Sequence, residues 1–199
     1  WLAMTGNRLK AADSFAAGIA THYVTTDKID AAHAFITEGL SADKNTADLL
    51  DEIHQDPGAP VQLNKETRTT IDACFASNRA EEIVANLEDE KSKHGDESWA
   101  AKQLTTLATK SPQSVKVALK QIRLGGAMSD FADNMAMEYA AVSRIVMDAE
   151  FHEGVRAVIL DKDNDPKWRY ASIADVPDTD IDAVFDPLPA DQAWVPLDM

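Results

Sequence analysis

The sequence comprises 199 residues, enough for one domain with a substantial core, and its 45% hydrophobic and 27% charged residues are ordinary for a folded protein. Its 34 acidic against 19 basic residues give a formal charge of −15, which repels phosphate backbones and anionic headgroups and so argues against nucleic-acid or membrane partners. The single cysteine, Cys74, excludes an internal disulfide, and no stretch of 18 apolar residues predicts a membrane span.

The chain opens with apolar residues. It begins Trp1-Leu2-Ala3-Met4 without an initiator methionine, which is unusual for a solvent-exposed N-terminus, and we therefore expect Trp1 to be an internal position of a longer polypeptide. Residues 2–4 are interpreted as the end of one helix, and Gly6 is well placed to terminate it. A second helix is predicted over residues 11–17, with Gly18 at its end.

The next segment has a different pattern. Residues 19–24, Ile-Ala-Thr-His-Tyr-Val, alternate with β-branched and aromatic side chains, which predicts a short strand. Nothing else in the chain is a convincing strand. The expected fold class is therefore mostly α-helical with one or two short strands.

Helical spacing dominates the middle of the chain. Apolar residues recur there at intervals of three and four, which is typical of amphipathic helices. The predicted helices cover residues 28–40, 46–55, 67–77, 79–90 and 98–109. Residues 56–60, with two prolines and a glycine, and the charged residues 91–97 are predicted loops. Cys74 lies in an apolar stretch and is predicted to be buried.

The last third continues with helices and ends in an acidic segment. Ser111-Pro112 has the pattern of a cap followed by a proline at the first helical position, which predicts a helix over 112–123. Gly125-Gly126 is predicted to end it, and Ser129 or Asp130 to cap a long helix through residue 147. A further helical turn is expected over 152–160 and a polar turn over 162–168. Residues 175–199 are predicted to form an acidic, proline-containing tail that packs on the body through Phe185 and Trp194 or not at all.

Self-contained catalytic machinery is missing from the sequence. We find no Walker phosphate loop, no GxGxxG, no GxSxG and no HExxH motif. The five histidines are scattered, and only His152-Glu153 pairs two metal-ligating side chains, at a spacing that points them to different sides of a helix. The residues alone therefore predict no metal site and a mostly helical, acidic part of a larger protein.

Two segments carry a resemblance to a known family. Residues 2–13 (LAMTGNRLKAAD) and 17–24 (AGIATHYV) resemble a stretch of the crotonase superfamily in which a helix ends at LTG and a strand follows a glycine. Residues 151–168 (FHEGVRAVILDKDNDPKW) resemble the FHEGVRAxxxDKDxxPKW signature of the 3-hydroxyisobutyryl-CoA hydrolases within that superfamily. Shorter matches lie at 73–76, 81–87 and 111–116, so the resemblance covers roughly residues 1 to 170.

The resemblance implies a fold and a position within it. The chain would be the C-terminal half of a crotonase ββα spiral together with its helical C-terminal lobe. Residues 1–27 would end the spiral core, residues 28–110 would form the helical insert of the hydrolase group, residues 111–174 would form the C-terminal lobe, and residues 175–199 the acidic tail.

The resemblance also implies thioester hydrolysis. In the family, two backbone N–H groups form an oxyanion hole and early carboxylates activate water or a covalent intermediate. These groups precede the LTG helix, so no catalytic residue is expected in this chain. The expected substrate contacts are Lys162 and Lys167 on the CoA phosphates, with Phe151 or Trp168 packing on adenine. Plain surface lysines and core aromatics are the alternatives, and no cofactor is expected beyond the CoA of the substrate.

Other functions remain open at this stage. Hydratases and isomerases share the fold, and a crotonase-like subunit without catalysis would serve as a structural or interaction protein. An N-terminal half, a complementary chain or a second copy is the expected partner, because the apolar faces of Leu2, Leu9, Ile19 and Val24 would otherwise be uncovered. The expected location is the cytoplasm in a bacterium and the mitochondrial matrix in a eukaryote.

Overall fold

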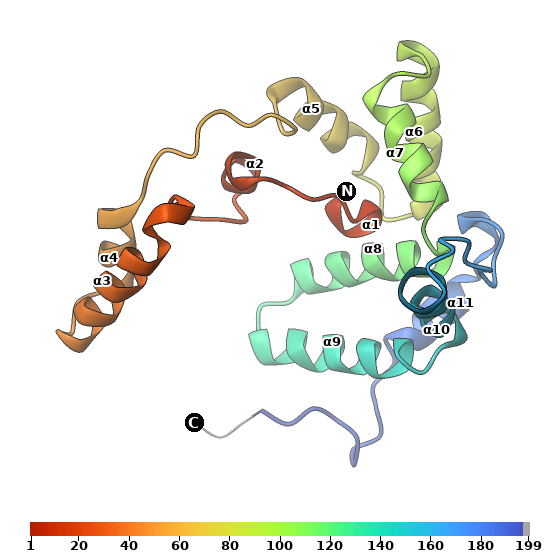
Figure 1. Cartoon of the computed structure of the whole chain (residues 1–199). Coiled ribbons are helices and arrows are strands. Elements are labelled where there is room, and N and C mark those ends of the chain that lie inside the picture. Colours follow the sequence, from red (N-terminus) through yellow and green to blue (C-terminus); the bar gives the residue numbers. More distant parts are fainter. Residues whose placement is uncertain (197–199) are drawn as a thin grey trace. The chain divides into compact units, whose positions relative to one another are not determined.

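The computed structural model describes residues 1–196 (Figure 1). The chain divides into two compact units, one formed by Arg8–Thr70 and the other by Trp1–Asn7 together with the residues from Ile71 onward. Helices dominate both units, as the sequence predicts, and no strand occurs within residues 1–196.

The helices follow one another along the chain, with longer connections over residues 54–64 and 161–172. The α-helices are α1 (Leu2–Thr5), α2 (Ala11–Ala16), α3 (Ile29–Ser41), α4 (Thr46–Ile53), α5 (Lys65–Cys74), α6 (Ala80–His94), α7 (Trp99–Ala108), α8 (Pro112–Ala127), α9 (Phe131–Ile145), α10 (Ala149–Val155) and α11 (Asp178–Val184). Two 3-10 turns, η1 (Thr26–Lys28) and η3 (Ile173–Asp175), and one π-helical turn, η2 (Arg156–Leu160), complete the set.

The predicted strand over residues 19–24 is wrong. The backbone bends at residues 19 and 21, and a strand also needs a partner that continues the ladder of hydrogen bonds. Here the backbone N–H of Gln55 donates to the carbonyl of Tyr23 at 2.9 Å, and Tyr23 N donates to the His54 ring at 3.0 Å. The His22 ring contacts Asp51 of α4 at 2.9 Å. One backbone bond and these side-chain bonds hold the segment near the end of α4 without forming a sheet.

In the unit formed by residues 8–70, α3 and α4 make a helical hairpin (Figure 1). The Asn45 side chain caps α4 by accepting from Ala47 N at 2.8 Å. Leu49 of α4 is fully buried and lies over Gly39 of α3, where a Cβ would come within 2.4 Å of a Leu49 methyl group. The absence of a side chain at Gly39 therefore lets the two helices approach.

The other unit is built around α6, α7 and α8. Helices α6 and α7 pair side by side, and α1 packs on α8 (Figure 1). Cys74, at the end of α5, is buried in this core, as predicted. The buried core residues of this cluster are Met4, Cys74, Phe75, Ala80, Ile83, Leu87, Ala100, Leu107, Val115 and Leu119. Apolar residues at helical spacing from several helices thus produce one shared core.

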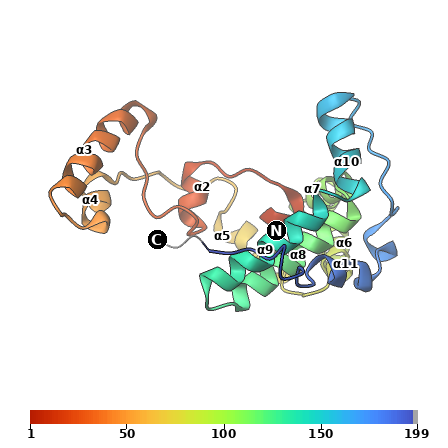
Figure 2. The same cartoon turned by 90° about the horizontal axis from the view of Figure 1, so that it is seen from below.

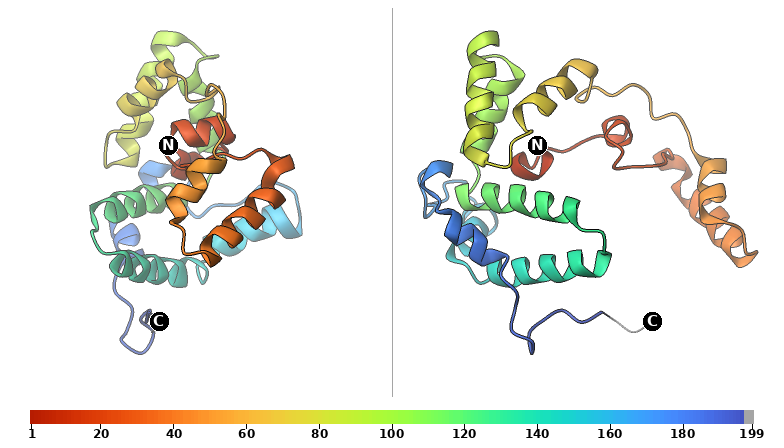
Figure 3. Two further views of the ribbon diagram at one scale, coloured as in Figure 1. Left: turned by 90° about the vertical axis from the view of Figure 1, so that its left-hand side faces the viewer. Right: turned by 180° about the vertical axis from the view of Figure 1, so that it is seen from behind.

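Helices α8 and α9 run roughly antiparallel, with α11 beside them (Figures 1 and 3). Val117 of α8, Ala141 of α9 and Ile181 of α11 share a second buried cluster. Ser111 caps α8 by accepting from Ser114 N at 3.2 Å, and Asp130 caps α9 by accepting from Ala132 N at 2.6 Å. Both caps are confirmed.

Two predicted helix ends and the structure predicted for the acidic segment are wrong. Helix α8 continues through Gly125-Gly126 to Ala127, because the helix is held by its packing and tolerates the lower intrinsic propensity of glycine. Helix α6 continues through the charged residues 91–94 and ends at Gly95, whose φ is 86°. The acidic segment after residue 175 contains α11, for which Lys116 provides a buried anchor: its ammonium donates to Asp178 and to Glu81.

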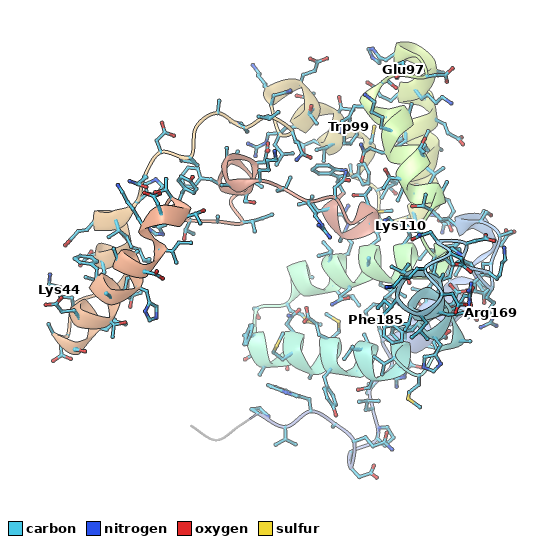
Figure 4. The ribbon with its side chains drawn as sticks, viewed as in Figure 1. Lys44, Glu97, Trp99, Lys110, Arg169 and Phe185 are labelled. Carbon is cyan, nitrogen blue, oxygen red and sulfur yellow. The ribbon has the colours of Figure 1, made fainter. Side chains whose placement is uncertain are left out.

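The tail prediction names Phe185 and Trp194 as packing residues. Phe185 packs against the second buried cluster, and the Lys120 ammonium lies 5.2 Å from the centre of its ring (Figure 4). Trp194 is half-buried. The division into the segments 1–27, 28–110, 111–174 and 175–199 concerns the family fold and stays a prediction.

Candidate functional site

The four residues expected to contact CoA all lie on residues 151–168. Asp148 starts this part of the chain by capping α10, accepting from Glu150 N at 2.8 Å. After the π-helical turn η2 the chain reverses and returns alongside α10 (Figure 2). Backbone N–H groups of the returning segment donate to carboxylates of α10. Lys167 N donates to Glu153 at 2.6 Å, and Arg169 N donates to Glu150.

Arg156 lies at the centre of this segment. Its Nε and Nη2 donate to the two oxygens of Glu153 at 2.9 and 2.8 Å. Its Nη1 donates to Asp161 at 2.7 Å and to Asp163 at 2.6 Å, and Nη2 also donates to the Asp165 carbonyl at 3.2 Å. The guanidinium therefore connects α10 to both halves of the polar turn.

This arrangement shifts the acidities of the partners. The hydrogen bonds from Arg156, followed by the bond from Lys167 N, lower the pKa of Glu153 to about 2. The Arg156 guanidinium also lowers the pKa of Asp163, and its carboxylate partners raise the pKa of Arg156 itself. These carboxylates stay ionised at neutral pH and are poorly suited to act as general acids there.

The two lysines lie at the surface of the segment. Lys162 is exposed and has a left-handed backbone with φ of 57°. Lys167 is also exposed, and its ammonium pairs with Asp165. Both ammonium groups are accessible to an anion, which is compatible with phosphate contact and with simple solvation alike.

The two aromatic residues behave differently from each other. Trp168 is half-buried, and its ring lies against Gly154 of α10, where a Cβ would come within 3.3 Å of the ring. Phe151 is 43% exposed, and its ring centre lies 6.1 Å from that of His152. Trp168 is therefore a packing residue of the segment, whereas Phe151 leaves an apolar edge open.

A buried carboxylate links residues 151–168 to the start of α8. Glu150 is 7% exposed, accepts a hydrogen bond from the Ser111 hydroxyl at the start of α8, and accepts another from the backbone of Arg169, which Figure 4 labels. The sequence analysis missed both Glu150 and the central role of Arg156. The alternating acids at 161, 163 and 165 after an arginine were the available signal for the second.

Two depressions of the same unit are each lined by more than one lysine or arginine. One, of about 400 Å³, lies among α6, α8 and α11 and includes Arg79, Lys116 and Lys120. The other, of about 560 Å³, lies among α6, α7 and η3 and includes Lys91, Lys110 and Ile173. Neither is lined by any of the four residues expected to contact CoA.

Within residues 1–196, no three histidine, cysteine, aspartate or glutamate side chains gather as they would around a metal ion. Over the same residues, none of the helices combines the length and the apolar character needed to cross a membrane.

Comparison with known proteins decides the family. The sequence model described as enoyl-CoA hydratase/isomerase matches residues 1–185. The chain belongs to the enoyl-CoA hydratase/isomerase family. The matched range includes all the segments on which the resemblance to this superfamily rests.

Two curated relatives share one name. The chain is 35% identical over 195 residues to the mitochondrial 3-hydroxyisobutyryl-CoA hydrolase of Homo sapiens, covering 93% of this chain and 47% of that protein. It is 38% identical over 190 residues to the Xenopus laevis protein of the same name, covering 93% and 48%. The resemblance to these hydrolases is confirmed, and the chain spans about half the length of the curated relatives it matches.

Solved structures of the family extend the likeness to the fold. A carnitinyl-CoA dehydratase from Mycobacterium thermoresistibile matches with a TM-score of 0.75 at 30% identity, covering 94% of this chain and 50% of that one. An enoyl-CoA hydratase from Rhodobacter sphaeroides matches with a TM-score of 0.73 at 28% identity, covering 97% and 52%.

Proposed function

We propose that residues 1–199 form the C-terminal part of an acyl-CoA thioester hydrolase that acts on 3-hydroxyisobutyryl-CoA, a step of valine breakdown. The observation that carries the proposal is the identity of 35% and 38%, over 93% of the chain, to proteins named as that hydrolase. The signature-like segment 151–168 supports the proposal, since hydrogen bonds from Arg156 hold its residues together.

The chemistry of the complete enzyme would be hydrolysis of a thioester. Backbone N–H groups that stabilise the developing oxyanion supply much of the rate in such reactions. These groups, and the carboxylates that activate water, are expected before residue 1. The contribution of this chain would be to cover the acyl pocket and to hold the CoA moiety.

For the CoA contact we propose Lys162 and Lys167. Each carries an exposed ammonium on the rigid polar turn, and the only ion-pair partner of Lys167 among the described residues is Asp165. Phe151 presents a partly exposed ring on which adenine can stack, while Trp168 supports the turn through its contact with Gly154. No cofactor is needed beyond the CoA of the substrate.

A second function is favoured by a separate observation. The solved structures that match the chain are a carnitinyl-CoA dehydratase and an enoyl-CoA hydratase, so hydration or dehydration of a CoA thioester is the alternative chemistry. A crotonase-like subunit without catalysis is the third. The partner would be an N-terminal half, a complementary chain or a second copy of this one.

The proposed location follows the relatives. The curated hydrolases named above are mitochondrial, which suggests the matrix for a eukaryotic source and the cytoplasm for a bacterial one.

The test is a comparison of two reactions in one preparation. The protein is purified from its source through an affinity tag, and 3-hydroxyisobutyryl-CoA and a short enoyl-CoA are offered separately. We expect free thiol to appear from the first substrate and the second to stay unhydrated. Hydration of the enoyl-CoA without thiol release would favour the alternative enzyme, and neither reaction would favour the structural subunit.

A further inference from the structure

Arg156 has more acceptors than any other cation described in this chain. Five oxygens surround its guanidinium: two from Glu153, one each from the carboxylates of Asp161 and Asp163, and the carbonyl of Asp165. We propose that Arg156 is a positioning residue, a half-buried cation that folds residues 161–168 and so fixes Lys162 and Lys167 for the CoA phosphates. The role in CoA binding rests on the proposed function.

The donor count excludes a direct role for Arg156 in binding an anion. A guanidinium has five N–H groups in a rigid fork. Nε uses its single N–H on Glu153, Nη1 uses two on Asp161 and Asp163, and Nη2 uses two on Glu153 and on the carbonyl of Asp165. All five are engaged within the protein, so a phosphate would have to displace an existing partner.

The backbone of the turn depends on this cation. Lys162 and Asn164 both have left-handed backbones, with φ of 57° and 54°, a conformation that costs energy in residues other than glycine. Two backbone bonds tie the turn to η2, Asp161 N to the Arg156 carbonyl at 2.8 Å and Asn164 N to the Ala157 carbonyl at 3.0 Å. The carboxylates of Asp161 and Asp163 and the backbone carbonyl of Asp165 face Arg156, whereas Lys162 between them is exposed.

The positive charge of Arg156 also neutralises the carboxylates around it. Glu153, Asp161 and Asp163 bring three carboxylates to one guanidinium, and without it they would repel one another and any nearby phosphate. Arg156 thus orders the turn and screens its acids from an anionic ligand. A lysine at position 156 has only three donors and cannot replace all five hydrogen bonds.

The experiment compares Arg156→Met and Arg156→Lys with Arg68→Met. Arg68 is an exposed arginine whose guanidinium makes no hydrogen bond or ion pair within residues 1–196, so its loss changes the charge equally. The first readout is amide hydrogen exchange of residues 161–168. The second is the split between KM and kcat in the protein purified from its source, with a CoA thioester and with the corresponding pantetheine thioester, which lacks the phosphates.

For Arg156→Met we expect faster exchange confined to residues 150–169, and a KM for the CoA thioester raised at least about tenfold, as the loss of a charge-assisted network implies. The kcat and the pantetheine KM should stay within about twofold of the unsubstituted protein, as expected for a lost ground-state contact. Arg156→Lys should have an exchange rate and a KM between those of Arg156→Met and the unsubstituted protein. Arg68→Met should change neither readout.

Each contrary result has a distinct meaning. Unchanged exchange in Arg156→Met would overturn the inference, because the turn would then fold without the cation. Faster exchange with an unchanged KM for the CoA thioester would also overturn it, because the turn would not position the ligand. Absence of thioester hydrolysis in the unsubstituted protein would instead refute the proposed function, and the exchange readout would still decide whether Arg156 folds the turn.

Discussion

The Ser111 hydroxyl donates a hydrogen bond to the buried Glu150 carboxylate, across 39 positions of sequence. The same hydroxyl oxygen accepts from Ser114 N and so caps α8. Glu150 in turn accepts from the backbone of Arg169. One pair of residues therefore joins the start of α8, the first turn of α10 and the end of the segment that carries the proposed CoA contacts.

This link predicts a large effect of Ser111→Ala. The substitution removes a helix cap, worth about 1 kcal/mol, and leaves a buried carboxylate with one fewer donor, which costs about 1–3 kcal/mol. We expect the free energy of unfolding, measured by urea denaturation, to fall by about 2–3 kcal/mol. Ser98→Ala is the control, because the Ser98 hydroxyl caps α7 through Ala101 N at 3.2 Å and has no second partner within residues 1–196, and it should cost about 1 kcal/mol. Equal losses in the two variants would contradict the link.

Alanine at two helical glycines should have opposite effects. In Gly39→Ala the new methyl would lie 2.4 Å from the fully buried Leu49, so the substitution should destabilise the α3–α4 hairpin by about 1–3 kcal/mol. In Gly126→Ala nothing lies within 4 Å, and the better helix propensity should stabilise α8 by up to about 1 kcal/mol. Thermal denaturation of both variants provides the measurement. A stabilising Gly39→Ala would show that α3 and α4 are not packed as described.

The buried Asp13 holds the chain before α5. Its Oδ1 accepts from Gln62 N at 2.8 Å and from Leu63 N at 2.9 Å, and its exposed fraction is 1%. Asp13→Ala should cost about 2–4 kcal/mol, because it leaves a buried N–H without an acceptor and removes two charge-assisted bonds. Asp13→Asn keeps the oxygen and should cost clearly less, by urea denaturation. A similar loss in both variants would show that charge, and not the acceptor oxygen, matters there.

The Glu153–Arg156 pair predicts a pH dependence of the turn. The pKa of Glu153 is about 2 in the folded state against an ordinary value of 4.5, so the unfolded turn binds the proton more readily. Its stabilising contribution is therefore complete above pH 4.5 and is lost as the pH falls from there toward 2. Amide exchange of residues 161–168, compared with a distant helix at each pH, should show this loss. In Glu153→Gln the dependence should shrink, and an unaltered profile would exclude Glu153 as its source.

The sequence predicts the helices better than it predicts their limits. Capping residues such as Asn45, Ser98 and Ser111 act locally, so most helix starts can be inferred from composition. The strand over 19–24 could not be excluded in this way, because strand formation depends on a partner elsewhere in the chain. Helix α11 was missed for a related reason: its three aspartates contact Lys116, Lys120 and Tyr170, partners that sequence neighbours do not reveal.

For the candidate site, too, the sequence predicted the location but not the contacts between distant residues. The resemblance of residues 151–168 indicated where to look, and it named Lys162, Lys167, Phe151 and Trp168. The spacing of residues did not show that one guanidinium would gather five oxygens, since this depends on the reversal of the chain after η2. Nor did it show the burial of Glu150, whose donors lie 39 positions before it and 19 after it.

We propose that the complete protein is a thioester hydrolase whose catalytic groups lie outside residues 1–199. We would measure the release of free thiol from 3-hydroxyisobutyryl-CoA in two samples. One is the tagged protein purified from its source, whose intact mass is also measured, and the other is the separately purified 21.7 kDa chain. We expect hydrolysis only in material that contains a longer polypeptide or a second chain. Hydrolysis by the 21.7 kDa chain alone would contradict the claim, because the catalytic groups would then lie within residues 1–199.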